Sequence, residues 1–229
     1  MKAGILFSGG KDSNFSLYLA KEAGYDIACL ISIEPARSDS MLFHYPNIWV
    51  TKLQAESMNI PILYHKAREN EDESKLLMNL VSKASQNFGI KVIVTGGVKS
   101  KYQRRSFIDS ISPLGIQVFN PLWEVDESKY LYQMVSLGFK FIMTSVSAYG
   151  LGPDWLGKIF DVNMIDKLLF LSKKYGFNPS LEGGEGETLV LDAPNYTKEL
   201  ILENSDLYWD GTRGILKVKR VSLRDKIRV

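Results

Sequence analysis

Apolar residues in the first half of the chain occur either as short continuous runs or at helical spacing. Four of the runs have the length and the content of branched apolar residues that buried strands show, and they cover residues 3–7, 26–33, 60–65 and 91–95. Between these runs, apolar positions recur every three or four residues, which predicts helices at residues 14–23, 49–58 and 76–88. Strands that alternate with helices indicate βαβ units. We therefore predict an α/β fold with a Rossmann-like, doubly wound parallel sheet.

The second half of the chain shows a looser pattern of short elements. We predict a short strand, a helix, a strand and a helix, at residues 117–123, 126–137, 140–146 and 161–175. A β-hairpin is predicted to pair residues 187–191 with residues 215–218, and the basic tail at 217–228 alternates with apolar residues as an edge strand would. These patterns divide the chain into a larger domain, residues 1–120, and a smaller α+β domain, residues 121–229.

Composition narrows the class of protein. The 229 residues are 45% hydrophobic and 24% charged, which is typical of a globular protein with a sizeable core. A net charge of +2 is too small to indicate nucleic-acid binding, no apolar run reaches the ~20 residues of a membrane span, and the first residues form a strand instead of a signal peptide. We expect a cytoplasmic protein without a membrane partner or a stable nucleic-acid partner.

The single cysteine, Cys29, lies inside an apolar run. One cysteine excludes an intrachain disulfide and a four-cysteine metal or iron–sulfur site within the chain. We predict that Cys29 is a buried strand residue without a catalytic role.

The segment Ser8-Gly9-Gly10-Lys11-Asp12-Ser13 directly follows the first apolar run and precedes the first predicted helix. A strand, a glycine turn and a helix start present backbone N–H groups and a positive helix end to one point, where phosphate is the natural ligand. Gly9 and Gly10 allow positive φ angles and a close approach. Lys11 supplies a mobile positive charge for a phosphate oxygen, and Ser8 and Ser13 supply hydroxyl donors.

This loop differs from the common ATPase loop. A Walker A loop reads Gly-x-x-x-x-Gly-Lys-Ser/Thr, but here Ile5 stands at its first glycine and Asp12 follows the lysine. A phosphate would repel Asp12 unless a cation lay between them, so we predict that Asp12 is a Mg²⁺ ligand. The alternative is an ordinary Gly-Gly turn with a solvated lysine and aspartate, which the flanking strand and helix disfavour.

Ligands of doubly wound sheets bind at the carboxyl ends of the strands. The loops after Phe7, Ile33 and Thr95 should therefore meet at one site. We predict that Ser32, Gly96 and Gly97 contact the nucleotide together with residues 8–13. For Gly96-Gly97, an ordinary turn at a helix start is the competing interpretation.

Two polar segments are candidates for substrate binding. The long loop after the second strand contains Asn47 and His44, a residue that titrates near neutrality. Tyr102, Gln103 and Arg104 begin the helix after Gly96-Gly97 and suit the recognition of a carboxylate or phosphate group. An exposed loop histidine and a solvated basic helix end are the alternatives.

Glutamates separated by glycines precede the strand at 187–191, in the order Glu182-Gly183-Gly184-Glu185-Gly186-Glu187. Their carboxylates repel one another unless a cation or a proton is present, and the glycines allow the backbone to turn them toward one point. We interpret that point as a place for Mg²⁺, an ammonium ion or a cationic substrate. A solvated acidic loop is the alternative.

The Ser-Gly-Gly-Lys-Asp-Ser motif resembles the pyrophosphate loop (PP-loop) of the N-type ATP pyrophosphatases, whose fold is adenine nucleotide alpha hydrolase-like. The resemblance implies that ATP is cleaved between its α and β phosphates, that an acceptor oxygen is adenylated, and that AMP and pyrophosphate are released. It makes residues 1–120 the ATP-binding domain and residues 121–229 the substrate domain.

Further motifs, in order along nearly the whole chain, resemble the diphthine–ammonia ligase family. They are residues 8–13, His44 with Asn47, Ser100 with Tyr102-Gln103-Arg104, Pro121-Leu122-Trp123, Trp155-Leu156-Gly157-Lys158 and residues 182–190. The resemblance implies ATP-dependent amidation of diphthine on translation elongation factor 2, with Mg²⁺ on Asp12. Lys11 would neutralise the departing pyrophosphate. A carboxylate of Glu182, Glu185 or Glu187, with Glu185 as the first choice, would bind ammonium and act as its base.

Two other functions remain open from the sequence alone. One is a PP-loop enzyme that adenylates tRNA or a small carboxylate, although the near-neutral charge and the lack of paired cysteines weigh against tRNA thiolation. The other is a non-enzymatic ATP sensor, in which Asp12 and the acidic segment would have no purpose. The sequence leaves both a monomer and an oligomer open.

Overall fold

The computed structural model describes residues 1–36, 47–69 and 71–226. The chain divides into two compact units, Met1–Trp123 and Glu124–Val229, where the sequence analysis placed a boundary after residue 120.

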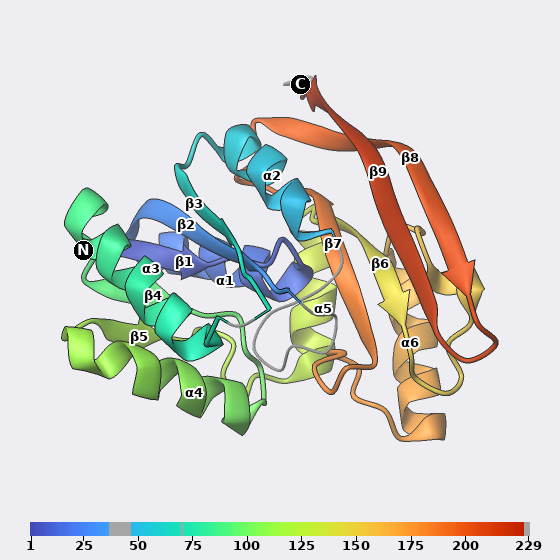
Figure 1. The fold of residues 1–229 in the computed structure, drawn as a ribbon. Helices are drawn as coiled ribbons and strands as arrows, with labels where there is room; N and C mark the ends of the chain where they lie inside the picture. Colours follow the sequence, from blue (N-terminus) through green and yellow to red (C-terminus); the bar gives the residue numbers. More distant parts are fainter. Residues whose placement is uncertain (37–46, 70, 227–229) are drawn as a thin grey trace. The chain divides into compact units, whose positions relative to one another are not determined.

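The first unit is a five-stranded parallel sheet with helices on both faces (Figure 1). Its strands are β1 (Lys2–Leu6), β2 (Asp26–Glu34), β3 (Ile62–Lys66), β4 (Val92–Val94) and β5 (Gln117–Phe119). Its helices are α1 (Lys11–Glu22), α2 (Thr51–Met58), α3 (Glu73–Phe88) and α4 (Lys101–Ile111), with 3-10 turns η1 (Ile48–Val50) and η2 (Ser112–Leu114). The strand order β3-β2-β1-β4-β5 confirms the predicted doubly wound sheet, and it places the change of winding direction between β1 and β4.

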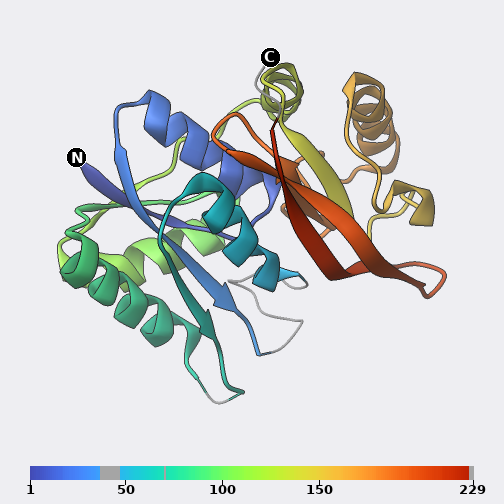
Figure 2. The ribbon, with the colours of Figure 1, turned by 90° about the horizontal axis from the view of Figure 1, so that it is seen from above.

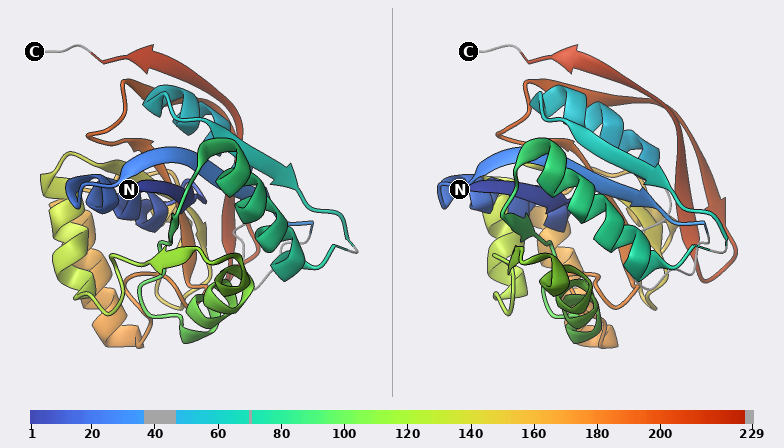
Figure 3. Two further views of the ribbon diagram at one scale, coloured as in Figure 1. Left: turned by 90° about the vertical axis from the view of Figure 1, so that its left-hand side faces the viewer. Right: turned by 60° about the vertical axis from the view of Figure 1, so that its left-hand side comes forward.

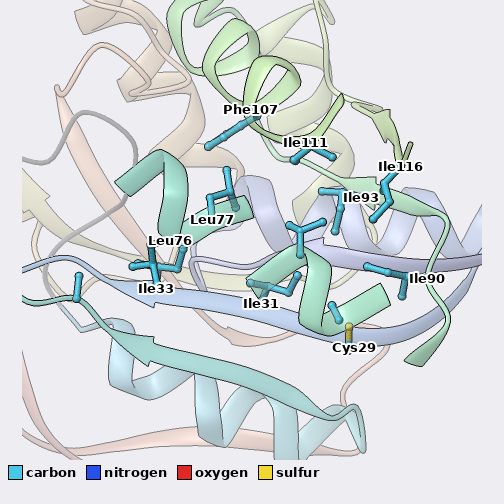
Figure 4. Close-up of a cluster of buried hydrophobic side chains, with 13 residues drawn as sticks. Cys29, Ile31, Ile33, Leu76, Leu77, Ile90, Ile93, Phe107, Ile111 and Ile116 are labelled. Atoms are coloured by element: carbon cyan, nitrogen blue, oxygen red, sulfur yellow. The ribbon is translucent and has the colours of Figure 1, made fainter. Parts of the chain in front are cut away.

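A hydrophobic cluster fixes α3 and α4 on one face of this sheet (Figure 4). Leu77 of α3 and Ile111 of α4 are fully buried against Ile93 of β4 and Cys29 of β2. Full burial of one such aliphatic side chain contributes about 1.5–3 kcal/mol. The right-handed crossovers of β1, β2 and β3 place α1 and α2 on the opposite face (Figures 2 and 3). Cys29 is buried in β2, which confirms its predicted place in a buried strand.

The second unit is a four-stranded antiparallel sheet in the order β7-β6-β9-β8. Its strands are β6 (Lys140–Val146), β7 (Gly186–Asp192), β8 (Lys198–Trp209) and β9 (Gly214–Asp225). Its helices are α5 (Glu127–Ser136) and α6 (Val162–Tyr175), with a 3-10 turn η3 (Pro153–Trp155). Within the described ranges, no helix combines the length and the hydropathy that a membrane span requires.

The predicted hairpin between residues 187–191 and 215–218 is wrong. β7 pairs with β6, and β9 pairs with β8 along its whole length, from Trp209↔Gly214 to Lys198↔Asp225. β9 stands between β6 and β8 in the sheet order, but it pairs with β6 only through Gly214 and Ile215. Residues 217–225 of the tail pair with β8 alone, as predicted for an edge strand. The Asp210 carboxylate accepts the N–H groups of Thr212 and Arg213 at 2.8 and 2.7 Å, so a tight local turn selects the β8–β9 pair.

Candidate functional site

The glycine loop ends where α1 begins, at Lys11 instead of the predicted residue 14. α3, α5 and α6 each follow an aspartate whose carboxylate accepts N–H groups of the first turn; these are Asp72, Asp126 and Asp161. Gly10 holds the corresponding position of α1 in extended conformation, and it makes no side-chain cap. No side-chain carboxylate of a cap residue therefore neutralises the positive end of the α1 dipole, which faces the glycine loop. A glycine loop at an uncapped helix start is the arrangement that binds phosphate.

Side chains of the loop and of the first turn of α1 stiffen the turn. Ser13 Oγ donates to the Gly10 carbonyl at 3.1 Å, and Asn14 Nδ2 donates to the same oxygen at 3.0 Å. The hydroxyls of Ser8 and Ser13 lie 3.2 Å apart. A hydroxyl has one proton. Ser13 uses it inside the loop here, where the sequence analysis assigned it to phosphate.

Lys11 and Asp12 form an ion pair at the start of α1. Lys11 Nζ donates to Asp12 Oδ2 at 2.8 Å, and the two side chains are 3% and 24% exposed. The ion pair holds Lys11 inside the fold, where the sequence analysis predicted a mobile positive charge for a phosphate oxygen. Since the rotamer entropy of Lys11 is already lost on folding, a phosphate that binds there does not have to order it.

Two residues outside the motif hold the loop from different elements. Gln54 of α2 is fully buried and donates Nε2 to the Gly9 carbonyl at 2.9 Å. Gly9 has a φ angle of 81°, and a Cβ atom there would lie 2.5 Å from Gln54 Oε1. Gly96 follows β4, and a Cβ atom there would lie 2.9 Å from the backbone nitrogen of Ser13. The contact with Gln54 therefore requires a glycine at position 9, and the contact with the backbone of Ser13 requires one at position 96.

Sequence reasoning missed Gln54. Its signal was a polar residue at helical spacing from two buried residues, three positions after Thr51 and four before Met58. A glutamine on the buried face of a helix must find a hydrogen-bond partner, and the backbone of the glycine loop supplies it.

Ser32 links the ends of the two central strands. Its side chain is 1% exposed, and Oγ donates to the carbonyl of Phe7, the residue before the loop, at 2.6 Å. The hydroxyl proton therefore anchors β2 to the start of the loop. Gly97, which follows Gly96, is half-buried after the end of β4.

Charged groups gather at the carboxyl ends of β2 and β3. Glu34 accepts hydrogen bonds from the Tyr64 hydroxyl and, at 3.0 Å, from Lys66 Nζ. Burial alone would raise the pKa of Glu34, but these two hydrogen bonds outweigh it and hold that pKa below its ordinary value. His65 Nε2 lies 3.0 Å from Glu71 Oε2, and the pKa of Glu71 is lowered, first by the Arg68 backbone N–H and then by His65.

The candidates for substrate binding are placed unequally. His44 lies outside the described residues, and so do the side chains of Tyr102 and Gln103, although their backbone belongs to α4. Asn47 precedes η1 with a φ angle of 72°, a left-handed conformation that asparagine tolerates.

Arg104 has a defined partner. Its guanidinium carbon lies 4.6 Å from the centroid of the Trp123 ring, a cation–π contact. Arg104 is on α4, which follows β4, and Trp123 follows β5, so both reach the carboxyl edge of the parallel sheet. Trp123 belongs to a motif of the family resemblance that carried no assigned role.

Glu185 and Glu187 make different contacts in the second unit. Glu185 Oε1 accepts the N–H of Asn178 at 3.0 Å, and Glu187 lies in β7 opposite Ser145. Glu185 Oε2 is buried and has no hydrogen-bond partner among the described residues. Across the described ranges, no three His, Cys, Asp or Glu residues are grouped as metal ligands.

Comparison with known proteins gives a consistent result along the chain. The family model for the diphthamide synthase N-terminal domain matches residues 1–117, and that for the diphthamide synthase C-terminal domain matches residues 126–223. A protein of Schizosaccharomyces pombe called diphthine–ammonia ligase is 33% identical over 99% of this chain, which spans 40% of that protein's length. The protein of that name from Bos taurus is 33% identical over 90% of this chain and 85% of its own length.

Among solved structures, the U34-tRNA thiolase NcsA from Methanococcus maripaludis aligns with 80% of this chain and 69% of its own. The sequence identity is 14% and the TM-score is 0.40, a level of likeness from which we infer nothing about activity.

Proposed function

The chain belongs to the diphthamide synthase family, and from this membership we propose that it is an ATP-dependent ligase that amidates diphthine to diphthamide. The acceptor is the diphthine side chain of translation elongation factor 2, the nitrogen comes from ammonium, and the other products are AMP and pyrophosphate. This is the function that the sequence motifs imply, and the matches to both family models support it.

The observation that carries the adenylation step is the start of α1, which has no side-chain cap, with the ion pair of buried Lys11 and half-buried Asp12 beside it. The diphthine carboxylate attacks the α-phosphorus of ATP, and the bond to the β-phosphate oxygen breaks. Lys11 and the loop N–H groups stabilise the negative charge that develops on the departing pyrophosphate. Because Lys11 is already held in place, this stabilisation needs little reorganisation during the reaction.

The residues present fit a Mg²⁺ ion bound together with the nucleotide. Mg²⁺ is commonly held by one or two carboxylates together with substrate phosphates and water. Asp12 is a partly exposed carboxylate beside the loop, and the described residues contain no separate metal cluster that would hold the ion alone. When bound, the ion would neutralise phosphate charge, and Asp12 is the residue that would hold it.

In the second step ammonia attacks the acyl carbon of the adenylate, the bond to AMP breaks, and one proton leaves the nitrogen. Ammonium is not nucleophilic until it loses a proton. We assign that proton to the Glu185 carboxylate, whose buried Oε2 has no donor among the described residues and would accept an N–H group of ammonium. The residues that we propose to bind the acceptor are Arg104, Asn47, His44, Tyr102, Gln103, Glu182 and Glu187.

The first test measures pyrophosphate release from ATP and Mg²⁺ with elongation factor 2 that carries diphthine, with and without ammonium. Unmodified factor is the matched control. We expect release that depends on the diphthine group, and an acceptor mass that changes as a hydroxyl is replaced by an amino group only when ammonium is present.

Other outcomes would redirect the proposal. Pyrophosphate release that is indifferent to diphthine would retain adenylation but assign another acceptor, and salt-dependent RNA binding would then indicate tRNA. ATP binding without any pyrophosphate would support a nucleotide sensor. A Lys11→Ala variant tests whether the pyrophosphate comes from this loop, because release that uses the loop should be lost in that variant.

A further inference from the structure

We infer that Glu127 and Ser180 are positioning residues that fix the carboxylate of Glu185 through a chain of hydrogen bonds. The inference rests on the proposed role of Glu185 in binding ammonium. All the contacts that carry it lie within the second unit, between the start of α5, the loop before β7 and the end of β6.

The chain begins at the Glu127 carboxylate in the first turn of α5. Ser180 Oγ donates to Glu127 Oε1 at 2.8 Å. The N–H of Ser180 donates to Asn178 Oδ1 at 2.9 Å, and the N–H of Asn178 donates to Glu185 Oε1 at 3.0 Å. Glu127 therefore acts on Glu185 through Ser180 and Asn178, with the Asn178 side chain as one of the links.

The Ser180 hydroxyl has only one proton to donate, and Glu127 Oε1 and Asn178 Oδ1 are both acceptors within its reach. Asn178 Oδ1 lies 2.7 Å from Ser180 Oγ, but it already accepts the N–H of Ser180. A hydrogen bond to an ionised carboxylate is the stronger one, so the proton goes to Glu127. Ser180 is 1% exposed, which means that removing its hydroxyl leaves a poorly hydrated gap beside the carboxylate.

The backbone of the loop before β7 is held in a conformation that its residues do not favour on their own. Leu181 is buried and has a φ angle of 65°, a left-handed conformation that a leucine keeps only where its surroundings impose it. Ser147, directly after β6, donates its N–H to the Glu185 carbonyl at 2.8 Å. The Glu185 side chain folds back over Gly183, where a Cβ atom would lie 2.7 Å from Glu185 Oε1.

These contacts hold the Oε1 atom of Glu185 in place and thereby set the orientation of Oε2. Oε1 is occupied by Asn178, so the orientation of Oε2 depends on how firmly residues 178–180 are held. Because Oε2 is buried without a protein donor among the described residues, a small cation with N–H donors is the chemical class that it would stabilise. Loss of the hydrogen bond from Ser180 to Glu127 should make the position of Glu185 Oε2 less well defined, and it should not change the glycine loop.

The experiment compares steady-state kinetics of Ser180→Ala, Glu127→Ala and Glu127→Gln with the wild type. We expect the KM for ammonium to rise about tenfold in the two alanine variants, as is typical for the loss of a hydrogen bond to a charged group, while the KM for ATP stays the same. Glu127→Gln retains an oxygen acceptor and should restore most of the ammonium affinity. Ser136→Ala, an exposed serine at the other end of α5, is the matched control and should change neither KM.

Glu185→Gln, measured in parallel, separates this inference from the proposed function. If Glu185→Gln raises the KM for ammonium but Ser180→Ala and Glu127→Ala do not, the positioning role is wrong and the role of Glu185 stands. If Glu185→Gln has no effect on that KM, the role of Glu185 and the positioning role of Glu127 and Ser180 are both wrong. The ligase activity itself is still tested by pyrophosphate release that depends on diphthine. Equal losses of ATP and ammonium affinity would indicate a purely structural role and would also overturn the inference.

A double-mutant cycle keeps the test valid if a single variant is less stable. Ser180→Ala combined with Glu185→Gln should raise the KM for ammonium no more than Glu185→Gln alone, because the first change acts through the second residue. Additive effects would contradict the inference.

Discussion

A methyl group on Gly96 would lie 2.9 Å from the backbone nitrogen of Ser13 and 3.0 Å from the carbonyl carbon of Asp12. Neither neighbour is a flexible side chain, so the end of β4 packs directly on the first turn of α1. We predict that Gly96→Ala displaces the glycine loop and weakens ATP binding at least about tenfold, because a misplaced anion site loses several charge-assisted hydrogen bonds. Isothermal titration calorimetry with ATP measures the effect.

Gly24→Ala is the control for this variant. Gly24, just beyond the other end of α1, has a φ angle of 82° and open space around its Cβ position. Alanine there should lower stability by about 1 kcal/mol through backbone strain but leave the dissociation constant of ATP unchanged. Equal ATP affinity in both variants would show that Gly96 has no special role at the loop.

The buried amide of Gln54 gives a second prediction. Gln54→Leu keeps the side-chain volume but leaves the Gly9 carbonyl without its donor, so we expect a loss of about 1–3 kcal/mol in the free energy of unfolding. ATP affinity should fall as well, because the loop loses its contact with α2. Urea unfolding followed by circular dichroism gives the first value, and calorimetry gives the second.

Gln86→Leu, at an exposed position of α3, should stay within about 0.5 kcal/mol of the wild type. A similar loss in both variants would mean that the Gln54 hydrogen bond contributes nothing specific.

The parallel sheet was predictable because each buried strand is a continuous apolar run and each helix has its own apolar face. The motif comparison also identified the family correctly, as the matches over residues 1–117 and 126–223 show. What the sequence did not reveal was β8. Its centre, Glu203-Asn204-Ser205-Asp206, is polar and interrupts the alternation, and the strand forms because β9 pairs with it after a tight turn.

Contacts between distant segments were the other limit. The motif located Lys11 and Asp12, but the neighbouring sequence does not indicate that their side chains pair with each other. It also does not indicate that Gly96 packs on the same turn. Gln54 reaches Gly9 from 45 positions along the chain. Such pairings follow from the sheet order, which periodicity alone does not determine.

The contact between Arg104 and Trp123 gives a third prediction, which concerns the acceptor. Trp123→Leu removes the aromatic face and should cost about 0.5–1 kcal/mol of acceptor binding, a rise of roughly two- to fivefold in the KM for the protein substrate. Trp123→Phe should retain part of that affinity, and the KM for ATP should not change in either variant.

Arg105→Ala serves as the control, since the Arg105 guanidinium is exposed and lies 3.6 Å from Asp109 on the same helix. If Arg104→Ala and Trp123→Leu have additive effects on the KM for the acceptor, the ring does not act through the guanidinium.

A fourth prediction concerns pH and Cys29. Burial raises the pKa of the Cys29 thiol to about 12. The folded state therefore holds the thiol proton more tightly than the unfolded state, where the pKa is about 8.5, and unfolding releases that proton in alkaline solution. Stability from this source is complete below about pH 8.5 and falls by about 1.4 kcal/mol per pH unit above it.

Urea unfolding at about pH 8 and about pH 10, for the wild type and for Cys29→Ala, isolates this contribution because other groups titrate equally in both proteins. The wild type should lose about 2 kcal/mol more than the variant over this interval. The same loss in both proteins would mean that the thiol ionises without leaving the folded core.

The position of β1 at the centre of its sheet has a consequence for how the protein is made. β1 is synthesised before β4, its partner in the sheet, with which it pairs for example through Ala3↔Val92. Gly96 follows β4. A nascent chain that ends before Gly96 carries the whole glycine motif but lacks the backbone against which α1 settles. The proposed anion site therefore forms only after most of the first unit has left the ribosome, but it does not have to wait for the second unit.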